Sequence, residues 1–198
     1  MPSVEAKYCL CCGEDVPYNT IFRGGQNQET CQYCGFVLDI KKEAIKKKVE
    51  TLTADCILLA EDSPLTRDII KAMLLQKKVA KSVLAFNDGQ QLVSEFTSRL
   101  TGHAPTSLVI LDLQMPVMDG ITTARIIRNL EEKFKITRIP ILFFSAHKCD
   151  EPLKKQMALY SPAVYLNKGS DTDSDVLLER VDQLMSYILQ KNAPPSAG

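Results

Sequence analysis

Short apolar segments recur along residues 53–191 and alternate with amphipathic stretches. The apolar segments CILLA, SVLAF, LVIL, ILFF and AVYL occupy residues 56–60, 82–86, 108–111, 141–144 and 163–166. Between and after them, apolar residues return every three or four positions, as in Leu92, Phe96 and Leu100, and in Leu177, Val181, Leu184 and Ile188. Continuous apolar strands that alternate with amphipathic helices are typical of a parallel sheet covered on both faces. We therefore predict an α/β domain with five parallel strands.

The rest of the chain divides into stretches of different composition. Residues 1–40 hold five of the seven cysteines and four of the nine glycines. Residues 41–52, KKEAIKKKVETL, combine lysines with apolar residues at helical spacing. Residues 192–198, NAPPSAG, have the composition of a frayed end. We predict a small cysteine-rich domain over 1–40, a lysine-rich linker helix over 41–52, the α/β domain over 53–191 and a disordered tail over 192–198.

Overall charge argues against a general attraction to polyanions. The chain contains 24 basic and 24 acidic residues, so no global field draws it to nucleic acid or to an anionic membrane. The longest apolar runs, such as IPILFF, are too short to span a bilayer, and the first residues lack the apolar core of a signal peptide. We expect a cytoplasmic protein that has no membrane partner.

Polar side chains follow four of the five predicted strands. The first strand leads into Glu61 and Asp62, the third ends at Asp112, the fourth at Ser145, and the fifth at Asn167 and Lys168. The carboxyl ends of parallel strands share one edge of the sheet, so these groups are expected to converge there. A single acid after a strand is usually a turn residue or a helix cap. The coincidence of acids, a hydroxyl and a lysine at four strand ends favours a functional site.

The chemistry of this predicted site points to phosphoryl transfer. Crowded carboxylates resist full ionisation, and a hard cation with oxygen ligands, such as Mg²⁺, relieves their repulsion. A metal ion, a lysine and a hydroxyl around one carboxylate supply the positioning and charge neutralisation that phosphoryl transfer requires. In this interpretation Asp112 attacks phosphorus and becomes an acyl phosphate.

Four motifs in this order resemble the CheY-like receiver domain of two-component response regulators. They are LLAEDSPLTR (58–67), VILDLQMPVMDG (109–120), FFSAH (143–147) and VYLNKG (164–169). The resemblance covers about residues 54–190 and implies a doubly wound, flavodoxin-like sheet with strand order 2-1-3-4-5. It implies a signalling protein that assists its own phosphorylation and dephosphorylation, rather than an enzyme.

The resemblance also assigns roles at the acidic strand ends. Asp112 would accept the phosphoryl group from a histidine kinase or a phosphotransfer protein. Asp62 and Asp112 would bind Mg²⁺ directly, together with the backbone carbonyl of Gln114. Glu61 would act on the metal through water.

The resemblance assigns the remaining strand ends to phosphoryl binding and switching. Ser145 and Lys168 would bind phosphoryl oxygens, and Ser145 would move toward them on phosphorylation. Tyr165 would be the switch aromatic that rotates inward, although an ordinary half-buried strand tyrosine fits the sequence equally well. Gly169 departs from the family, which usually has proline after the lysine, and we expect a looser loop there.

The cysteines of the first region have the spacing of a metal site. Cys9 and Cys12 form one CxxCG sequence, and Cys31 and Cys34 form a second. Two such turns supply four thiolates in the tetrahedral arrangement that zinc prefers, with no open position, so the zinc would be structural. The region looks like a zinc ribbon in which Cys11 is a spare thiol. Iron is the rival metal, because rubredoxins share paired CxxCG turns.

The output of such a protein has three candidate routes. Residues 1–40 carry two basic and five acidic residues, a net charge of −3, whereas residues 41–52 carry five lysines and two glutamates, a net charge of +3. We expect a signalling adaptor in which phosphorylation controls binding to a downstream protein, with the ribbon as docking module and a possible dimer through the receiver or linker. The alternatives are a nucleic-acid-binding regulator acting through ribbon and linker, and a redox sensor using Cys11.

Overall fold

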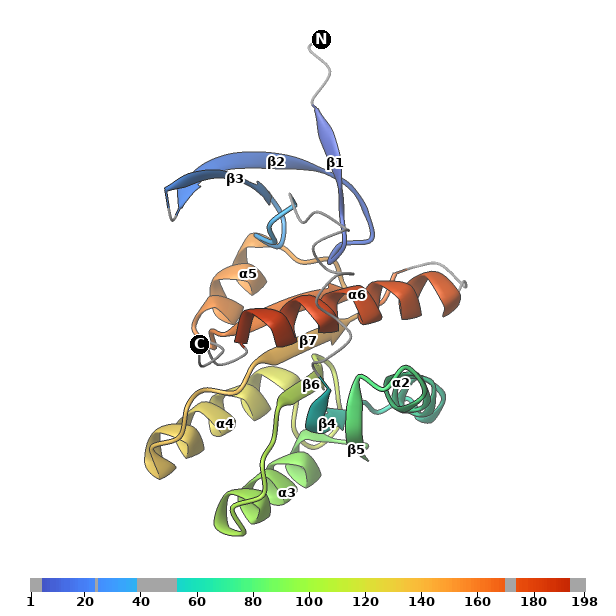
Figure 1. Cartoon of the computed structure of the whole chain (residues 1–198), viewed down its shortest axis with the longest axis vertical. Helices are drawn as coiled ribbons and strands as arrows, with labels where there is room; N and C mark the ends of the chain where they lie inside the picture. Colours follow the sequence, from blue (N-terminus) through green and yellow to red (C-terminus); the bar gives the residue numbers. More distant parts are fainter. Residues whose placement is uncertain (1–4, 24, 39–52, 170–173, 193–198) are drawn as a thin grey trace, which may run out of the picture.

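The structure, a computed structural model, contains one antiparallel and one parallel sheet (Figure 1). It describes residues 5–23, 25–38, 53–169 and 174–192. The linker helix predicted over 41–52 therefore lies outside the described residues. So does the predicted tail, except for Asn192, which ends the last helix.

The parallel sheet has the predicted topology. Its strand order, β5-β4-β6-β7-β8, is the expected order 2-1-3-4-5. The strands are β4 (Ala54–Ala60), β5 (Ala80–Phe86), β6 (Leu108–Asp112), β7 (Ile141–Ser145) and β8 (Ala163–Asn167). Each contains one predicted apolar segment with one or two further residues. Every residue of β6 and β7 is buried, because helices cover both faces of the sheet.

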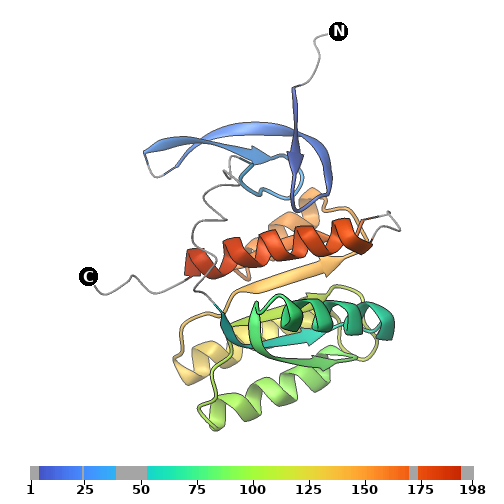
Figure 2. The same cartoon turned by 45° about the vertical axis from the view of Figure 1, so that its right-hand side comes forward.

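Helices lie on both faces of this sheet, as the doubly wound fold requires (Figures 1 and 2). They are α2 (Pro64–Gln76), α3 (Gly89–Thr101), α4 (Gly120–Phe134), α5 (Glu151–Ala158) and α6 (Ser174–Asn192). Helices α2 and α6 share an apolar cluster with one face, and α3, α4 and α5 share a cluster with the other. The helices α2 to α5 each start after a capping side chain that accepts a hydrogen bond from an amide three residues later. The caps are Ser63, Asp88, Asp119 and Asp150.

The small sheet forms what we call the cysteine module, residues 5–38. Its antiparallel strands are β1 (Ala6–Cys9), β2 (Glu14–Arg23) and β3 (Gln26–Cys31), in the order β1-β2-β3. A single bridge from Thr30 to Val37 continues the pairing beyond the second cysteine turn. The ends of β1 and β3 thereby bring the two CxxCG sequences to the same end of the sheet.

The cysteine module packs against α6, which lies between the module and the parallel sheet (Figure 2). One continuous apolar cluster joins Val16 and Phe36 of the module to Val181, Leu184 and other buried residues of α6. The rings of Phe36 and Tyr187 meet edge to face, with centroids 5.2 Å apart. Because the cysteine module and the α/β domain both bury apolar surface at this contact, they form one packed unit.

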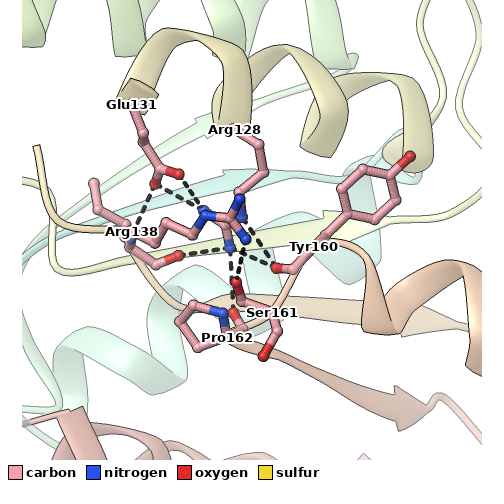
Figure 3. A network of polar contacts seen from close by, with 7 residues as sticks. Arg128, Glu131, Arg138, Tyr160, Ser161 and Pro162 are labelled. Atoms are coloured by element: carbon pink, nitrogen blue, oxygen red, sulfur yellow. Dashed lines mark hydrogen bonds and ion pairs between the residues drawn. The ribbon is translucent and has the colours of Figure 1, made fainter. Parts of the chain in front are cut away.

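A buried ion pair ties together loops at the amino ends of β7 and β8 (Figure 3). Arg128 of α4 pairs with Glu131 at 2.6 Å, with both side chains at most 5% exposed. The Arg128 guanidinium also donates to the backbone carbonyls of Ile139, Tyr160 and Pro162. Glu131 in turn accepts a hydrogen bond from the Ile139 amide at 2.7 Å. This network lies at the opposite end of the strands from the predicted site, and we interpret it as structural.

Crossing a membrane requires a helix that is both long and apolar, and none of the helices within the described residues meets both requirements.

Candidate functional site

Three carboxylates meet at the carboxyl ends of two paired strands. Glu61 and Asp62 directly follow β4, and Asp112 is the last residue of β6, which pairs with β4. One oxygen of each carboxylate lies within 4.8 Å of the other two. Glu61 and Asp112 are buried, whereas Asp62 is exposed. The structure thus brings together the three acids that the strand ends predict.

Lys168 reaches this group from the edge of the sheet. The residue follows β8, and its ammonium lies 2.8 Å from Glu61 Oε2 and 3.2 Å from Asp112 Oδ2. Its Nζ is 5.0 Å from the centre of the Phe144 ring of β7, the strand between β6 and β8. The side chain is only 18% exposed, so its charge acts on the carboxylates with little screening by water.

Burial and repulsion make the carboxylates suited to a cation. Burial raises the pKa of Glu61 and of Asp112, and the nearby Lys168 ammonium opposes the rise in both. Glu61 Oε2 is ion-paired with Lys168, but it accepts no directed hydrogen bond within the described part of the chain. A hard divalent cation prefers oxygen ligands of this kind and would lower the repulsion between them. The donor set therefore fits Mg²⁺, with Asp62 on the solvent side.

Ser145 and Gln114 also lie at this edge. The Ser145 hydroxyl accepts a hydrogen bond from the His147 amide at 3.1 Å, and the Ser145 carbonyl accepts one from the Lys168 amide at 2.7 Å. The backbone amide of Gln114 hydrogen-bonds to the Asp112 carboxylate and favours its charged form. The Gln114 side chain contacts His147 at 2.8 Å. A role of the Gln114 carbonyl as a metal ligand stays a prediction.

Tyr165 is more deeply buried than a half-buried strand residue. Only 2% of it is exposed, and its hydroxyl donates a hydrogen bond to the His147 carbonyl. The same hydroxyl accepts a hydrogen bond from Asn167 Nδ2 at 2.8 Å. Burial raises the pKa of Tyr165. The ring already points inward here, so the predicted inward rotation has no exposed starting position, and a switch role for Tyr165 stays a prediction.

Gly169 adopts a conformation that proline cannot. Its φ is +81°, whereas the proline ring fixes φ near −65°. Its amide donates a hydrogen bond to Asn167 Oδ1 at 2.6 Å, a bond that proline has no N–H to make. The looser loop expected from glycine is therefore held by a local hydrogen bond, at a residue type that tolerates positive φ.

The four predicted metal-binding cysteines converge in the cysteine module. Their sulfurs all lie within 4.8 Å of one another, with Cys9 to Cys34 at 3.6 Å and Cys12 to Cys31 at 3.7 Å. Tetrahedral zinc with bonds of about 2.3 Å needs sulfurs roughly 3.8 Å apart, so the spacing fits. The amides of Cys12 and Cys34 each point at the sulfur three residues earlier, at 3.4 Å. The arrangement therefore suits one four-coordinate metal ion.

Each cysteine turn ends at a glycine that the backbone geometry requires. Gly13 and Gly35 have φ values of +78° and +76°, in the region that favours glycine. Their amides close the turns by donating to the carbonyls of Cys9 and Cys31, at 2.8 and 3.0 Å. This confirms the tight turn that the CxxCG sequences predict.

Cys11, Asn167 and Arg180 have contacts that the sequence patterns did not predict. The Cys11 carbonyl accepts hydrogen bonds from the Asn167 amide at 2.7 Å and from Arg180 Nη2 at 2.9 Å. Arg180 is 5% exposed although it lies beside the apolar stripe of α6. The position of this charged residue next to the apolar stripe is the sequence feature that could have indicated a polar partner for α6.

Sequence comparison identifies relatives for the α/β domain. The family model of the response regulator receiver domain matches residues 57–182, more than half of the chain. Histidine kinase 1 of Arabidopsis thaliana is 30% identical over 167 residues, which cover 70% of this chain and 13% of that protein. Peroxide stress-activated histidine kinase mak3 of Schizosaccharomyces pombe is 25% identical over 169 residues, covering 75% and 7%. The chain thus spans a small part of these relatives.

Solved structures share the fold at lower sequence identity. A mutant of the receiver domain of the histidine kinase CKI1 from Arabidopsis thaliana has a TM-score of 0.58 at 22% identity, over 72% of this chain and 91% of that one. A chain in the co-crystal structure of the Saccharomyces cerevisiae phosphotransfer protein Ypd1 with the receiver domain of Ssk1 has a TM-score of 0.59 at 19% identity, over 75% and 97%. Together with the family match, the fold and the acidic strand ends lead to one conclusion: the chain belongs to the response regulator receiver domain family.

Proposed function

We propose that Asp112 accepts a phosphoryl group from a phosphohistidine of a histidine kinase or a phosphotransfer protein, in a reaction that needs Mg²⁺. The observation that carries the proposal is the position of the Asp112 carboxylate, beside Glu61 and Asp62 and 3.2 Å from the Lys168 ammonium. An Asp112 oxygen forms a bond to phosphorus, and the phosphorus–nitrogen bond to histidine breaks. The products are an acyl phosphate and a free imidazole.

The surrounding side chains favour this transfer by neutralising charge. Glu61, Asp62, Asp112 and the Gln114 carbonyl would hold Mg²⁺, which neutralises charge on the phosphoryl oxygens when it is bound. Lys168 places a fixed positive charge at the acceptor oxygen, and the Ser145 hydroxyl is available to a phosphoryl oxygen. Lys168 already contacts the acceptor carboxylate and needs no large movement to act.

Structures of related folds support the proposal. The CKI1 receiver domain is known in a complex with Mg²⁺ and beryllofluoride, and that structure has a TM-score of 0.53 to this chain. The Ypd1–Ssk1 structure joins a histidine phosphotransfer protein to the receiver domain of a response regulator. We therefore propose a phosphohistidine donor of the same kind for this chain.

The cysteine module is proposed to be a structural zinc ribbon that serves as the docking or output element. The four sulfurs have the spacing of a closed tetrahedral site, which leaves no position for substrate. Metal analysis of the purified protein tests this: one zinc per chain supports it, whereas visible thiolate-to-iron absorption contradicts it.

The structure bears on one of the two alternative functions, a redox sensor using Cys11, but not on the other, a nucleic-acid-binding regulator. Cys11 is fully buried, and burial raises the pKa of its thiol well above the ordinary value. Buried thiols of high pKa are poor redox sensors, so the structure disfavours that alternative. The lysine run of the nucleic-acid alternative lies at 41–52, outside the described residues, and this alternative stays a prediction.

Acetyl phosphate labelling tests the proposed function directly. The full-length protein is incubated with acetyl phosphate and Mg²⁺, and the acyl phosphate is detected on phosphate-affinity gels and by its lability to hydroxylamine. Asp112→Asn should abolish the label, and omission of Mg²⁺ should suppress it. Asp55→Asn is the matched control, because Asp55 is an exposed aspartate near the amino end of β4. Labelling that survives in Asp112→Asn would refute the assignment.

A further inference from the structure

We propose that the cysteine module holds Lys168 in its working position, through the backbone carbonyl of Cys11. This inference rests on the function proposed above. Cys11 lies in the first cysteine turn, residues 9–13, and its carbonyl accepts a hydrogen bond from the Asn167 amide at 2.7 Å. Asn167 directly precedes Lys168. A contact between the two modules thus reaches within one residue of the ammonium that faces Asp112.

The Cys11 carbonyl occupies a free edge of the parallel sheet. β8 is the last strand in the order, and among the described strands it pairs only with β7, so alternate amides of β8 point away from the sheet. Asn167 is the last residue of β8, and its outward amide meets Cys11, while the next amide, that of Lys168, points back to the Ser145 carbonyl at 2.7 Å. Asn167 and Cys11 are 6% and 0% exposed, so water does not readily replace this bond. The chain at Lys168 is therefore held from both sides.

The Asn167 side chain extends this hold to the residues around Lys168. Its Nδ2 donates to the His147 carbonyl at 2.8 Å, and its Oδ1 accepts from the Gly169 amide at 2.6 Å. These bonds fix the residues before and after Lys168 relative to the loop that follows β7. The position of Asn167 therefore fixes the backbone position of Lys168, from which the side chain extends toward Asp112.

Arg180 holds the first cysteine turn in the place that this contact requires. Its Nε donates to the Leu10 carbonyl and its Nη2 to the Cys11 carbonyl, both at 2.9 Å. Gly13 leaves room for the guanidinium, because a Cβ at Gly13 would lie 2.6 Å from Arg180 Cζ. Arg180 belongs to α6 of the receiver domain, so the turn is fastened to the domain on which it acts. We assign Arg180 and the Cys11 carbonyl as positioning groups for Lys168.

The test compares Arg180→Met with Lys154→Met in the full chain. Arg180→Met keeps an unbranched, flexible side chain but removes the guanidinium and with it both hydrogen bonds to the first cysteine turn. Lys154→Met is the matched control, because it removes a different contact to the module, from Nζ to the Gln32 carbonyl at 2.9 Å, which does not reach β8. We expect the rate of labelling by acetyl phosphate to fall roughly tenfold in Arg180→Met, as for a displaced catalytic group, and to stay unchanged in Lys154→Met.

Two further measurements separate positioning from a general loss of structure. Mg²⁺ affinity, followed by NMR shifts, should not fall in Arg180→Met, because the metal-binding carboxylates lie on other strands and a displaced Lys168 ammonium competes less with the cation for them. Combining Arg180→Met with Lys168→Met should give the rate of Lys168→Met alone, since both changes act through one ammonium. Arg180→Lys, which keeps the charge and a donor, should have an intermediate rate, and it serves as the test variant if Arg180→Met does not fold.

The possible outcomes distinguish a failure of this inference from a failure of the proposed function on which it rests. If the wild-type protein is never labelled at Asp112, the proposed function fails, and this inference fails with it. If the wild-type protein is labelled but the Arg180 variants match its rate, only the positioning role is overturned. An additive loss in the double variant also overturns it, because Arg180 then acts independently of Lys168.

Discussion

Replacing Lys168 with methionine should destabilise the protein in a manner that depends on pH. The ammonium lies 2.8 Å from Glu61 Oε2 and 3.2 Å from Asp112 Oδ2. At an effective dielectric constant of about 20, each attraction is worth roughly 5 to 6 kcal/mol before the cost of desolvation is subtracted. Removing one partner of a buried pair typically costs about 3–5 kcal/mol. Because the Lys168 side chain is itself 18% exposed, the pair is not fully desolvated, and we expect the lower end of this range, about 3 kcal/mol near neutral pH.

The pH dependence follows from the two carboxylates left behind. Burial raises the pKa of Glu61 and Asp112 in the folded protein, and loss of the ammonium removes the charge that opposes this rise. A raised carboxyl pKa means that the folded state is most favoured when the group is protonated, and that stability is lost as pH rises through the folded pKa. The deficit of Lys168→Met relative to wild type should therefore be largest at about pH 8 and should shrink toward about pH 5.5.

Urea unfolding followed by far-UV circular dichroism measures this deficit, without Mg²⁺ and at constant zinc. Lys155→Met is the control, because Lys155 is an exposed lysine of α5. Added Mg²⁺ should stabilise Lys168→Met more than wild type, because the cation takes over the neutralisation of the same carboxylates. A deficit that is constant across this pH range, or one that grows as pH falls, would refute the electrostatic reasoning.

Three other predictions concern separate parts of the molecule. Arg128→Met leaves Glu131 buried without its partner and should lower the free energy of unfolding in urea by about 3–5 kcal/mol. Labelling of the folded variant by acetyl phosphate should stay at the wild-type rate, because this network lies at the other end of the strands. Cys31→Ser removes one of four converging sulfurs, so metal analysis by mass spectrometry should find the bound zinc largely lost. Gly120→Ala would place a Cβ 2.2 Å from the Asp112 carbonyl oxygen, so we expect a loss of at least about 1–3 kcal/mol in thermal unfolding, together with slower labelling.

The parallel sheet was predictable because its sequence pattern is local. Strands buried on both faces must be apolar at every position, so five short apolar segments located β4 to β8 to within two residues. Parallel pairing then placed Glu61, Asp112 and Lys168 at one edge without any further information. The CxxCG spacing similarly predicted the convergence of four sulfurs, because each turn holds its own pair and only two turns had to meet.

The contact between the modules was not predictable because it depends mainly on backbone atoms. The Cys11 carbonyl and the Asn167 amide exist in almost any residue pair, so no sequence pattern marks them. From the sequence, Cys11 was therefore predicted to be a spare thiol. The structure shows that its backbone carbonyl, and not its thiol, makes the contact with the receiver domain. The deep burial of Tyr165 could not be predicted for a related reason. Burial of a residue in an edge strand depends on what covers that strand, and the sequence pattern of β8 does not specify its cover.

The same contact provides a route from the phosphorylation site to the cysteine module. If the Cys11 carbonyl stabilises the Lys168 position that binds a phosphoryl group, then phosphoryl binding must stabilise the contact by an equal free energy, because coupling between two binding events is reciprocal. Beryllofluoride with Mg²⁺ should therefore slow hydrogen exchange at the Asn167 amide, the donor to Cys11, and Arg180→Met should weaken this protection. The Lys168 amide, which bonds to Ser145 within the sheet, is the internal reference. Protection of Lys168 without any change at Asn167 would show that the signal stops at the sheet edge and does not pass to the module through Cys11.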